Sequence, residues 1–172
     1  MSTIQICVMG VSGSGKTTVG SELAVRLGRT FTDGDDLHPQ ANRDKMAAGH
    51  PLTDDDRWPW LDTIAHLFAD EAEAGRPIVL ACSALKRVYR DRIRSAGANV
   101  YFVLLTGTPE LLLQRMQARQ GHFMKADMLA SQLAILEPLE RDEFGVMVNV
   151  DGDIPHVVTE ALADVAAEEA VD

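Results

Sequence analysis

Residues 10–17 read Gly-Val-Ser-Gly-Ser-Gly-Lys-Thr, a complete G-x-x-x-x-G-K-[ST] phosphate-binding loop. Its glycines let the backbone turn so that successive N–H groups converge on phosphate oxygens. Lys16 can place its charge on the β- and γ-phosphates, and the Thr17 hydroxyl is available to Mg²⁺. The loop predicts a nucleoside triphosphate site with contacts from Gly10, Ser12, Gly13, Ser14, Gly15, Lys16, Thr17 and Thr18.

The segments on either side of this phosphate loop (residues 10–17) strengthen the prediction. Residues 4–9 form an apolar run typical of a buried parallel strand, and residues 17–27 carry apolar side chains at helical spacing before Gly28. A strand–loop–helix unit of this kind directs the positive end of the helix dipole at the bound anion. A plain glycine-rich turn, the alternative interpretation, would not explain that setting.

Composition limits the remaining possibilities. A chain of 172 residues is expected to form a single domain over residues 1–172. The net charge of −10 argues against a nucleic-acid partner, and no apolar stretch is long enough to predict a membrane span. The two cysteines, each in a predicted strand, are expected to be reduced core thiols, which favours a cytoplasmic location.

Strand and helix patterns alternate along the chain, which predicts an α/β fold with a parallel sheet and helices on both faces. In such a sheet, ligands bind beyond the carboxyl ends of the strands. Strands are expected at residues 4–9, 30–33, 78–82, 100–105 and 145–150. Helices are expected at residues 17–27, 40–48, 57–74, 86–95, 109–119, 126–136 and 154–168.

Acidic side chains follow the second predicted strand. Asp33 and Asp35, two positions apart at a strand end, would point the same way. One could orient the Mg²⁺ shell while the other meets the attacking hydroxyl, although Asp and Gly are also common in turns. No acidic residue ends the third strand, so metal orientation would come from Thr17, Asp33 and water. His38 is a candidate substrate contact.

Three basic residues are candidates for holding an anionic substrate. Arg57 is flanked by Trp58, Pro59 and Trp60, which should hold its backbone rigid for bidentate recognition of a carboxylate or of paired hydroxyls. Lys86 and Arg90 lie four positions apart on one face of a predicted helix and could clamp an anionic group.

Arg115 and Arg119 form another pair on one helix face. They are placed to reach the triphosphate from a lid at roughly residues 115–136, where they would stabilise charge and exclude water. The alternative is that they are ordinary surface arginines, since Glu110 could pair with one of them.

The chain resembles the gluconate kinase (gluconokinase) family of small sugar-acid kinases with a phosphate-binding loop. The resemblance spans residues 10 to about 138. It is carried by the stretches GVSGSGKTTVG, FTDGDDLHPQANRDKMAAGHPLTDDDRWPWL, LACSALKRVYRDRIR and GHFM…LASQLAILEP. The phosphate loop alone indicates only a nucleotide, whereas the D-G-D-x-L-H-P and C-S-A-L-K stretches are far more specific.

The resemblance implies a five-stranded parallel sheet of order 2-3-1-4-5, of the nucleoside-monophosphate and shikimate kinase type, with a lid. It implies transfer of the ATP γ-phosphate to the terminal hydroxyl of D-gluconate with Mg²⁺. Asp35 would then contact the acceptor hydroxyl, Asp33 would serve the metal, and Arg57 would hold the acid. The remaining implied roles are Lys86 and Arg90 at the anion site, Arg115 and Arg119 at the nucleotide, and residues 151–155, with Pro155, beside the adenine. Lys16, Asp35 and Arg119 would be the catalytic residues, and relatives are commonly homodimers.

Two alternatives remain. A kinase for another small polyol acid such as shikimate would be expected to have glycines in place of Ser83-Ala84-Leu85. A nucleotide-dependent regulatory module belongs to a different class, and a GTP-dependent switch would need an [NT]-K-x-D motif, which the 172 residues lack. Release of ADP that depends on an added sugar acid would distinguish an enzyme from a switch.

Overall fold

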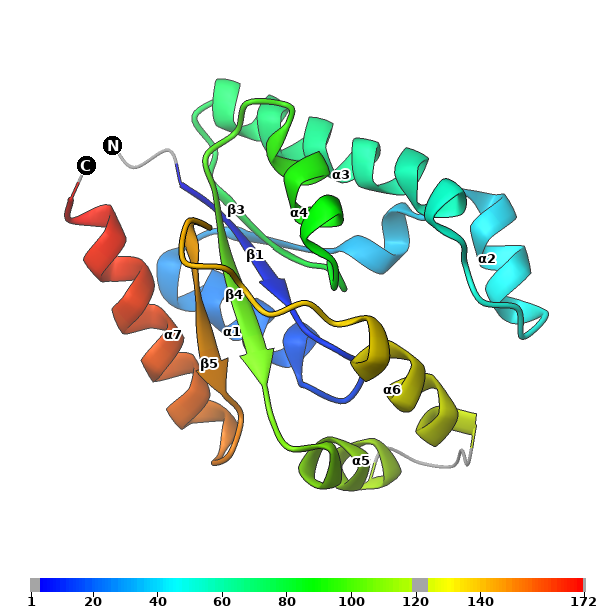
Figure 1. Ribbon diagram of the computed structural model, residues 1–172. Helices are drawn as coiled ribbons and strands as arrows, with labels where there is room; N and C mark the ends of the chain where they lie inside the picture. Colours follow the sequence, from blue (N-terminus) through cyan, green and yellow to red (C-terminus); the bar gives the residue numbers. More distant parts are fainter. Residues whose placement is uncertain (1–3, 119–123, 172) are drawn as a thin grey trace.

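The computed structural model describes residues 4–118 and 124–171, which form a parallel sheet covered by helices (Figure 1). Its five strands follow the order β2-β3-β1-β4-β5, and every neighbouring pair is parallel. The predicted fold class and strand order are therefore confirmed. The strands are β1 (Gln5–Met9), β2 (Thr30–Asp33), β3 (Ile78–Ala81), β4 (Val100–Thr106) and β5 (Gly145–Asn149).

The helices match their predicted ranges to within a few residues. They are α1 (Lys16–Leu27), α2 (Gln40–Ala47), α3 (Asp54–Glu73), α4 (Arg87–Arg94), α5 (Pro109–Ala118), α6 (Met124–Ile135) and α7 (Ile154–Glu169), with a short 3₁₀ helix η1 (Gly34–Leu37). The largest difference is at α3, which begins three residues before the predicted position 57. Thr53 starts it with a reciprocal cap, in which the Asp56 N–H donates to Thr53 Oγ1 at 3.2 Å and the Thr53 N–H to Asp56 Oδ2 at 2.8 Å.

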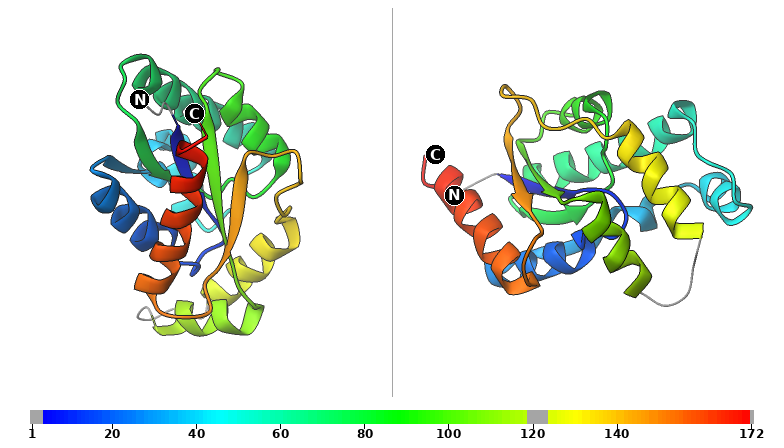
Figure 2. Two further views of the ribbon diagram at one scale, coloured as in Figure 1. Left: turned by 90° about the vertical axis from the view of Figure 1, so that its left-hand side faces the viewer. Right: turned by 60° about the horizontal axis from the view of Figure 1, so that its bottom comes forward.

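Two hydrophobic cores lie on opposite faces of the sheet, because successive strand side chains point to opposite sides. Along β1, Ile6 and Val8 face one core while Cys7 and Met9 face the other. The first core is completed by α1 and α7, and the second by α3 and α4, as the two further views show (Figure 2). Burial of both faces explains why the central strands read as continuous apolar runs.

Cys7 and Cys82 are both free and fully buried. Cys82 directly follows β3, and its N–H donates to Val8 O on β1 at 3.0 Å. Burial and the neighbouring Cys82 side chain raise the pKa of the Cys7 thiol well above its usual value. The two thiols therefore behave as core groups.

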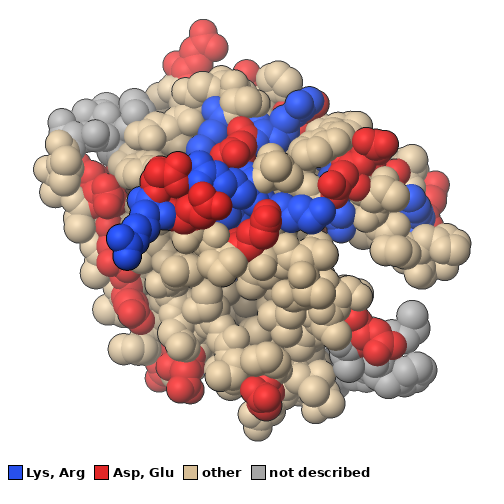
Figure 3. Space-filling model, in the orientation of Figure 1, with Lys and Arg blue, Asp and Glu red and all other residues tan. Residues whose placement is uncertain are grey.

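The carboxyl ends of β1, β4 and β5 point toward α5 and α6, which pack against each other beyond the sheet (Figure 1). Leu112, Met116 and Leu129 join this helix pair to the first core. Figure 3 shows an indentation of the molecular outline between α2 and the lower right-hand part of the molecule. Among the described residues, no helix is long and apolar enough to cross a membrane.

Candidate active site at the carboxyl edge of the sheet

The phosphate loop joins β1 to the first turn of α1. Gly13 and Gly15 have φ angles of 82° and 88°, in the left-handed region that glycine adopts without strain. A side chain at Gly13 would also be blocked, because its Cβ would lie 2.4 Å from Met116 Cγ. Lys16 begins α1, so the loop backbone and the helix N-terminus face the same space.

This loop suits a triphosphate with its Mg²⁺. The Ser14 hydroxyl is buried, with no hydrogen-bond partner among the described residues, and Thr17 is exposed in the first turn of α1. Within the described part of the chain, no group of three or more His, Cys, Asp or Glu side chains could hold a metal ion. The exposed Thr17 hydroxyl fits Mg²⁺ on a nucleotide, because such an ion takes few protein oxygens and is completed by phosphates and water.

Asp33 and Asp35 are presented by a tight turn and not by continued strand geometry. Asp33 ends β2 and caps η1, where its Oδ1 accepts the Asp35 N–H at 3.0 Å. Gly34 fits between them because a Cβ there would lie 2.5 Å from Ala81 O. The Gly34 carbonyl accepts the Trp60 indole N–H at 2.7 Å. The prediction that Asp33 and Asp35 follow strand spacing is thus wrong, although both residues lie at the end of β2.

The pKa of Asp35 depends on the surrounding chain and on three nearby charges. Burial by the surrounding chain raises the pKa of Asp35, the charge of Lys16 lowers it, and Asp33 and Asp36 raise it, leaving the pKa above the usual value. Lys16 of the phosphate loop is one of the charges that act on Asp35. A carboxylate in this place can orient or accept a proton from a hydroxyl that approaches the phosphates.

Arg57 and Lys86 share one acidic partner, Asp54. Lys86 Nζ is 3.3 Å from Asp54 Oδ1, and Arg57 Nη1 is 3.8 Å from the same oxygen. Arg57 Nη1 also donates to the Tyr89 hydroxyl at 3.2 Å, and that hydroxyl donates to Asp54. We call these four residues the charged cluster.

The charged cluster remains open to ligands on one side. The side chains of Arg57 and Lys86 are 23% and 30% exposed. The Tyr89 hydrogen bond, followed by Lys86 and Arg57, holds the pKa of Asp54 below its usual value, so the carboxylate stays charged. Two cations and one anion leave an excess of one positive charge for a small organic acid.

Sequence reasoning missed Asp54 and Tyr89. Asp54 stands first in a run of three aspartates, and the helix dipole alone would explain such a run at a helix start. Tyr89 is the third residue after Lys86. Residues at that spacing lie on the same face of a helix, so the sequence could have indicated that Tyr89 lies near Lys86.

His38 is held mainly by protein contacts. It is 8% exposed and stacks on Trp60 with ring centroids 4.0 Å apart, while Asn42 Nδ2 lies 3.3 Å from its Nδ1. Burial, with the charges of Arg43 and Arg57, lowers its pKa to about 4. His38 is thus neutral near pH 7, and its contact with substrate stays a prediction.

Arg90 does not have the predicted role. Its side chain is fully buried, where Nε and Nη2 donate to Glu143 at 2.7 and 2.8 Å. The guanidinium also donates to backbone carbonyls, of which that of Glu137 is 3.0 Å away. The prediction that Arg90 contacts the substrate is therefore wrong, because its donors are already used inside the protein. Arg90 instead attaches α4 to the segment between α6 and β5.

The observed hydrogen bonds of Arg115 are to the backbone, and its contact with a nucleotide stays a prediction. Its Nη2 donates to Val150 O at 2.5 Å and to Gly152 O at 2.8 Å. Its Nη1 is buried and has no partner among the described residues. Arg115 thereby supports the loop that leads to Pro155 at the start of α7. Arg119, the predicted partner of Arg115, lies outside the described residues.

Comparisons with known proteins agree with this geometry. A family model described as an AAA domain matches residues 6–139. The gluconokinase of Gluconobacter oxydans is 48% identical over 91% of this chain and 88% of its own. The thermoresistant gluconokinase of Escherichia coli is 45% identical over 86% and 84%. The crystal structure of a gluconokinase from Sinorhizobium meliloti has a TM-score of 0.89 and 45% identity, covering 96% of this chain and 93% of that one.

Proposed function

The chain belongs to the gluconokinase family, and from that membership we propose that it transfers the γ-phosphate of ATP to the 6-hydroxyl of D-gluconate. The products are 6-phospho-D-gluconate and ADP. The observation that carries the proposal is the charged cluster, in which Arg57 and Lys86 are mounted at the same edge of the sheet as the phosphate loop. A site that grips phosphates and offers a net cation nearby suits a sugar acid as the phosphate acceptor.

In the proposed reaction, positioning and charge supply most of the catalysis. The phosphate-loop N–H groups and Lys16 hold the triphosphate, while Arg57 and Lys86 hold the gluconate carboxylate. The 6-hydroxyl oxygen attacks the γ-phosphorus, the bond to the bridging oxygen of ADP breaks, and Asp35 takes up the hydroxyl proton. Mg²⁺, when bound through Thr17 and through water on Asp33, neutralises charge on the phosphates.

Other predicted residues have supporting roles in this proposal. Arg115 lies beside the loop before Pro155, which would border the adenine, and Arg119 would act from the lid segment 115–136. His38 would contact the acceptor. We also propose that the enzyme acts in the cytoplasm, without nucleic-acid or membrane partners. Assembly as a homodimer is a further proposal that sedimentation velocity would test.

A coupled assay of ADP release tests the proposal against its alternatives. Purified protein with Mg²⁺-ATP is given gluconate, glucose or shikimate in turn. We expect gluconate to exceed glucose by at least about a hundredfold in kcat/KM, because the neutral sugar leaves the paired cations without a carboxylate. Preference for shikimate would favour the other polyol-acid kinase, and ADP release unaffected by any acceptor would favour a regulatory module.

A further inference from the structure

Helix α6 contacts the phosphate loop through the side chain of Gln132. Gln132 Oε1 accepts the backbone N–H of Ser12 at 2.6 Å, and Gln132 Nε2 donates to Ser12 Oγ at 3.0 Å. The two residues are 120 positions apart in sequence. A reciprocal pair of this kind fixes the amide orientation, since only the amide oxygen can accept and only the amide nitrogen can donate.

The Gln132 amide has a second N–H donor that could bind a ligand. An amide nitrogen carries two hydrogens, and the bond to Ser12 uses one. The second has no partner among the described residues. The half-buried Gln132 side chain therefore brings a fixed, neutral N–H donor to the phosphate loop.

The place of Ser12 in the loop identifies which phosphate this donor would meet. The end of the loop at Gly15 and Lys16 opens α1, and this end brackets the phosphates nearer the nucleoside. Ser12 lies on the opposite limb of the loop, as the second residue of the turn in which the Ser14 N–H donates to Val11 O at 3.2 Å. The space beside Ser12 is thus left for the terminal phosphate.

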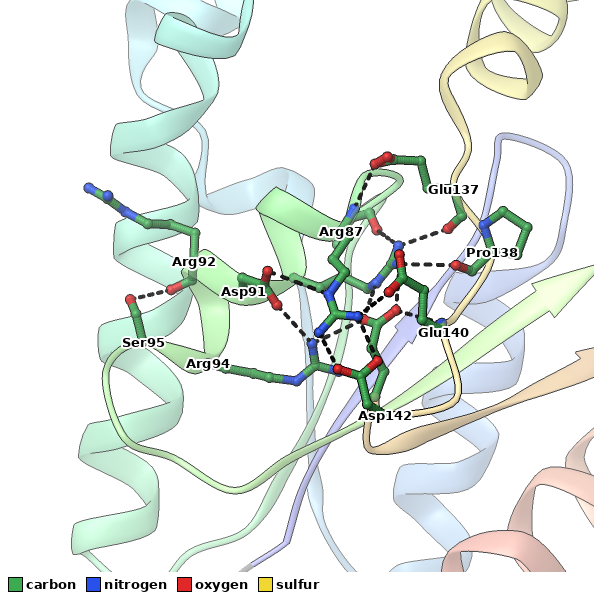
Figure 4. A network of polar contacts seen from close by, with 12 residues as sticks. Arg87, Asp91, Arg92, Arg94, Ser95, Glu137, Pro138, Glu140 and Asp142 are labelled. Carbon is green, nitrogen blue, oxygen red and sulfur yellow. Dashed lines mark hydrogen bonds and ion pairs between the residues drawn. The ribbon is translucent and has the colours of Figure 1, made fainter.

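The position of Gln132 is supported from both ends of α6. One turn earlier, Met128 Sδ accepts from Ser12 Oγ at 3.6 Å, and Leu129 is buried in the first core. Just after α6, the Glu137 N–H donates to Leu85 O at 2.7 Å, and its carboxylate accepts the Arg87 N–H at 3.1 Å. Figure 4 shows Glu137 beside this start of α4, within a wider network of ion pairs. Such support keeps a side chain in place for a ligand.

We propose that Gln132 is a positioning residue for the γ-phosphate, holding α6 on Ser12 while its second N–H donates to a terminal phosphate oxygen. The inference rests on the proposed phosphoryl transfer and adds a way for the site to distinguish ATP from ADP. ADP lacks the terminal phosphate, so the Gln132 donor contributes to the binding of ATP alone.

Calorimetry of nucleotide binding to wild-type and variant full-length protein tests the inference. The probes are the non-hydrolysable analogue AMP-PNP and ADP, each with Mg²⁺. Gln132→Ala removes the donor, so we expect AMP-PNP to bind about tenfold more weakly while ADP binding changes less than about twofold. Gln132→Glu still accepts the Ser12 N–H but brings a negative charge to the phosphate, and AMP-PNP should lose about a hundredfold.

Gln114→Glu provides the matched control, because it makes the same chemical change on the exposed surface of α5, outside the lid segment 115–136. It should bind both nucleotides as the wild type does. Equal weakening of AMP-PNP and ADP by the Gln132 variants, or no weakening, would show that Gln132 only anchors α6 and would overturn this inference alone. Failure of the wild type to bind either nucleotide would instead overturn the proposed function, and this inference with it.

Discussion

The carboxylate of Asp35 is expected to lower the free energy of unfolding and also to take up the proton of the acceptor hydroxyl. Its neighbours Asp33 and Asp36 and the surrounding chain raise its pKa, even though Lys16 acts in the opposite direction. We expect Asp35→Asn to lower kcat/KM by about 10²–10⁴-fold, since the variant cannot take up the hydroxyl proton. Rates measured from pH 5 to 9 should also show that the variant loses the acid limb that Asp35 causes in the wild type.

The stability of the same variant checks the cause of that pKa shift. A pKa raised in the folded state means that the folded protein binds the proton more tightly, so ionisation of Asp35 above that pKa destabilises it. Asp35→Asn should therefore have a higher urea midpoint than the wild type at pH 8. The gain should vanish below about pH 4, where the carboxyl is protonated in both states. A variant less stable than wild type at pH 8 would contradict this account.

Arg57 gives a second prediction at the scale of one residue. Arg57→Ala removes the guanidinium that we propose holds the gluconate carboxylate, so kcat/KM for gluconate should fall about a hundredfold while nucleotide binding stays near normal. Arg92→Ala is the matched control, since Arg92 is exposed and pairs with Asp62 at 2.5 Å, outside the charged cluster. Equal losses in both variants would mean that Arg57 acts through general surface charge.

Single residues were predictable from sequence when a motif or a rigid setting identified them. The phosphate loop was identified in this way, and the roles of Arg57 and Lys86 stay predictions. Arg90 was assigned wrongly because its partner Glu143 lies 53 positions away, and no local pattern distinguishes a buried arginine from an exposed one. Gln132 was missed for the same reason, since its partner lies on another element.

At the scale of elements, ion pairs connect α4 to the segment before β5 (Figure 4). Arg87 contacts Asp142 at 2.7 Å, Arg94 contacts Glu143 at 3.0 Å, and Arg90 and Glu143 form the buried centre. In the space-filling view, basic side chains gather over this part of the molecule with acidic ones between them (Figure 3). This network positions the helix that follows Lys86.

The buried pair predicts strong coupling between two elements. Glu143→Ala leaves the Arg90 charge buried without its carboxylate, which should cost about 3–5 kcal/mol in the free energy of unfolding. The double variant with Arg90→Met should lose clearly less than the sum of the two single variants in urea denaturation. Arg76→Ala breaks a surface pair with Glu71 and is the control, with no measurable change expected. Additive losses would show that the buried pair is uncoupled.

Elements were the most predictable level of this protein. Buried parallel strands read as apolar runs, helices read as 3.6-residue periodicity, and both signals are local. The exceptions depend on side-chain hydrogen bonds. The cap formed by Thr53 and Asp56 makes α3 begin before its predicted first residue, and the cap formed by Asp33 starts η1 where strand geometry was expected.

For the whole molecule, the sheet order places the central strand β1 and its phosphate loop between β3 and β4, so nucleotide binding should stabilise the entire fold. At a hundred times Kd, Mg²⁺-AMP-PNP should add about 2.7 kcal/mol, which raises Tm by about 5–10 °C for a chain of this size. Differential scanning fluorimetry measures the shift. Lys16→Ala should abolish most of it, and an undiminished shift in that variant would place the nucleotide elsewhere.

The two buried sulfhydryl groups allow the opening of the protein interior to be measured by chemical modification. Because Cys7 and Cys82 are sealed between the sheet and its helices, a thiol reagent can modify them only when the strands separate. The rate of thiol modification in native buffer therefore reports how often the interior opens widely. The measurement needs no dye or tag.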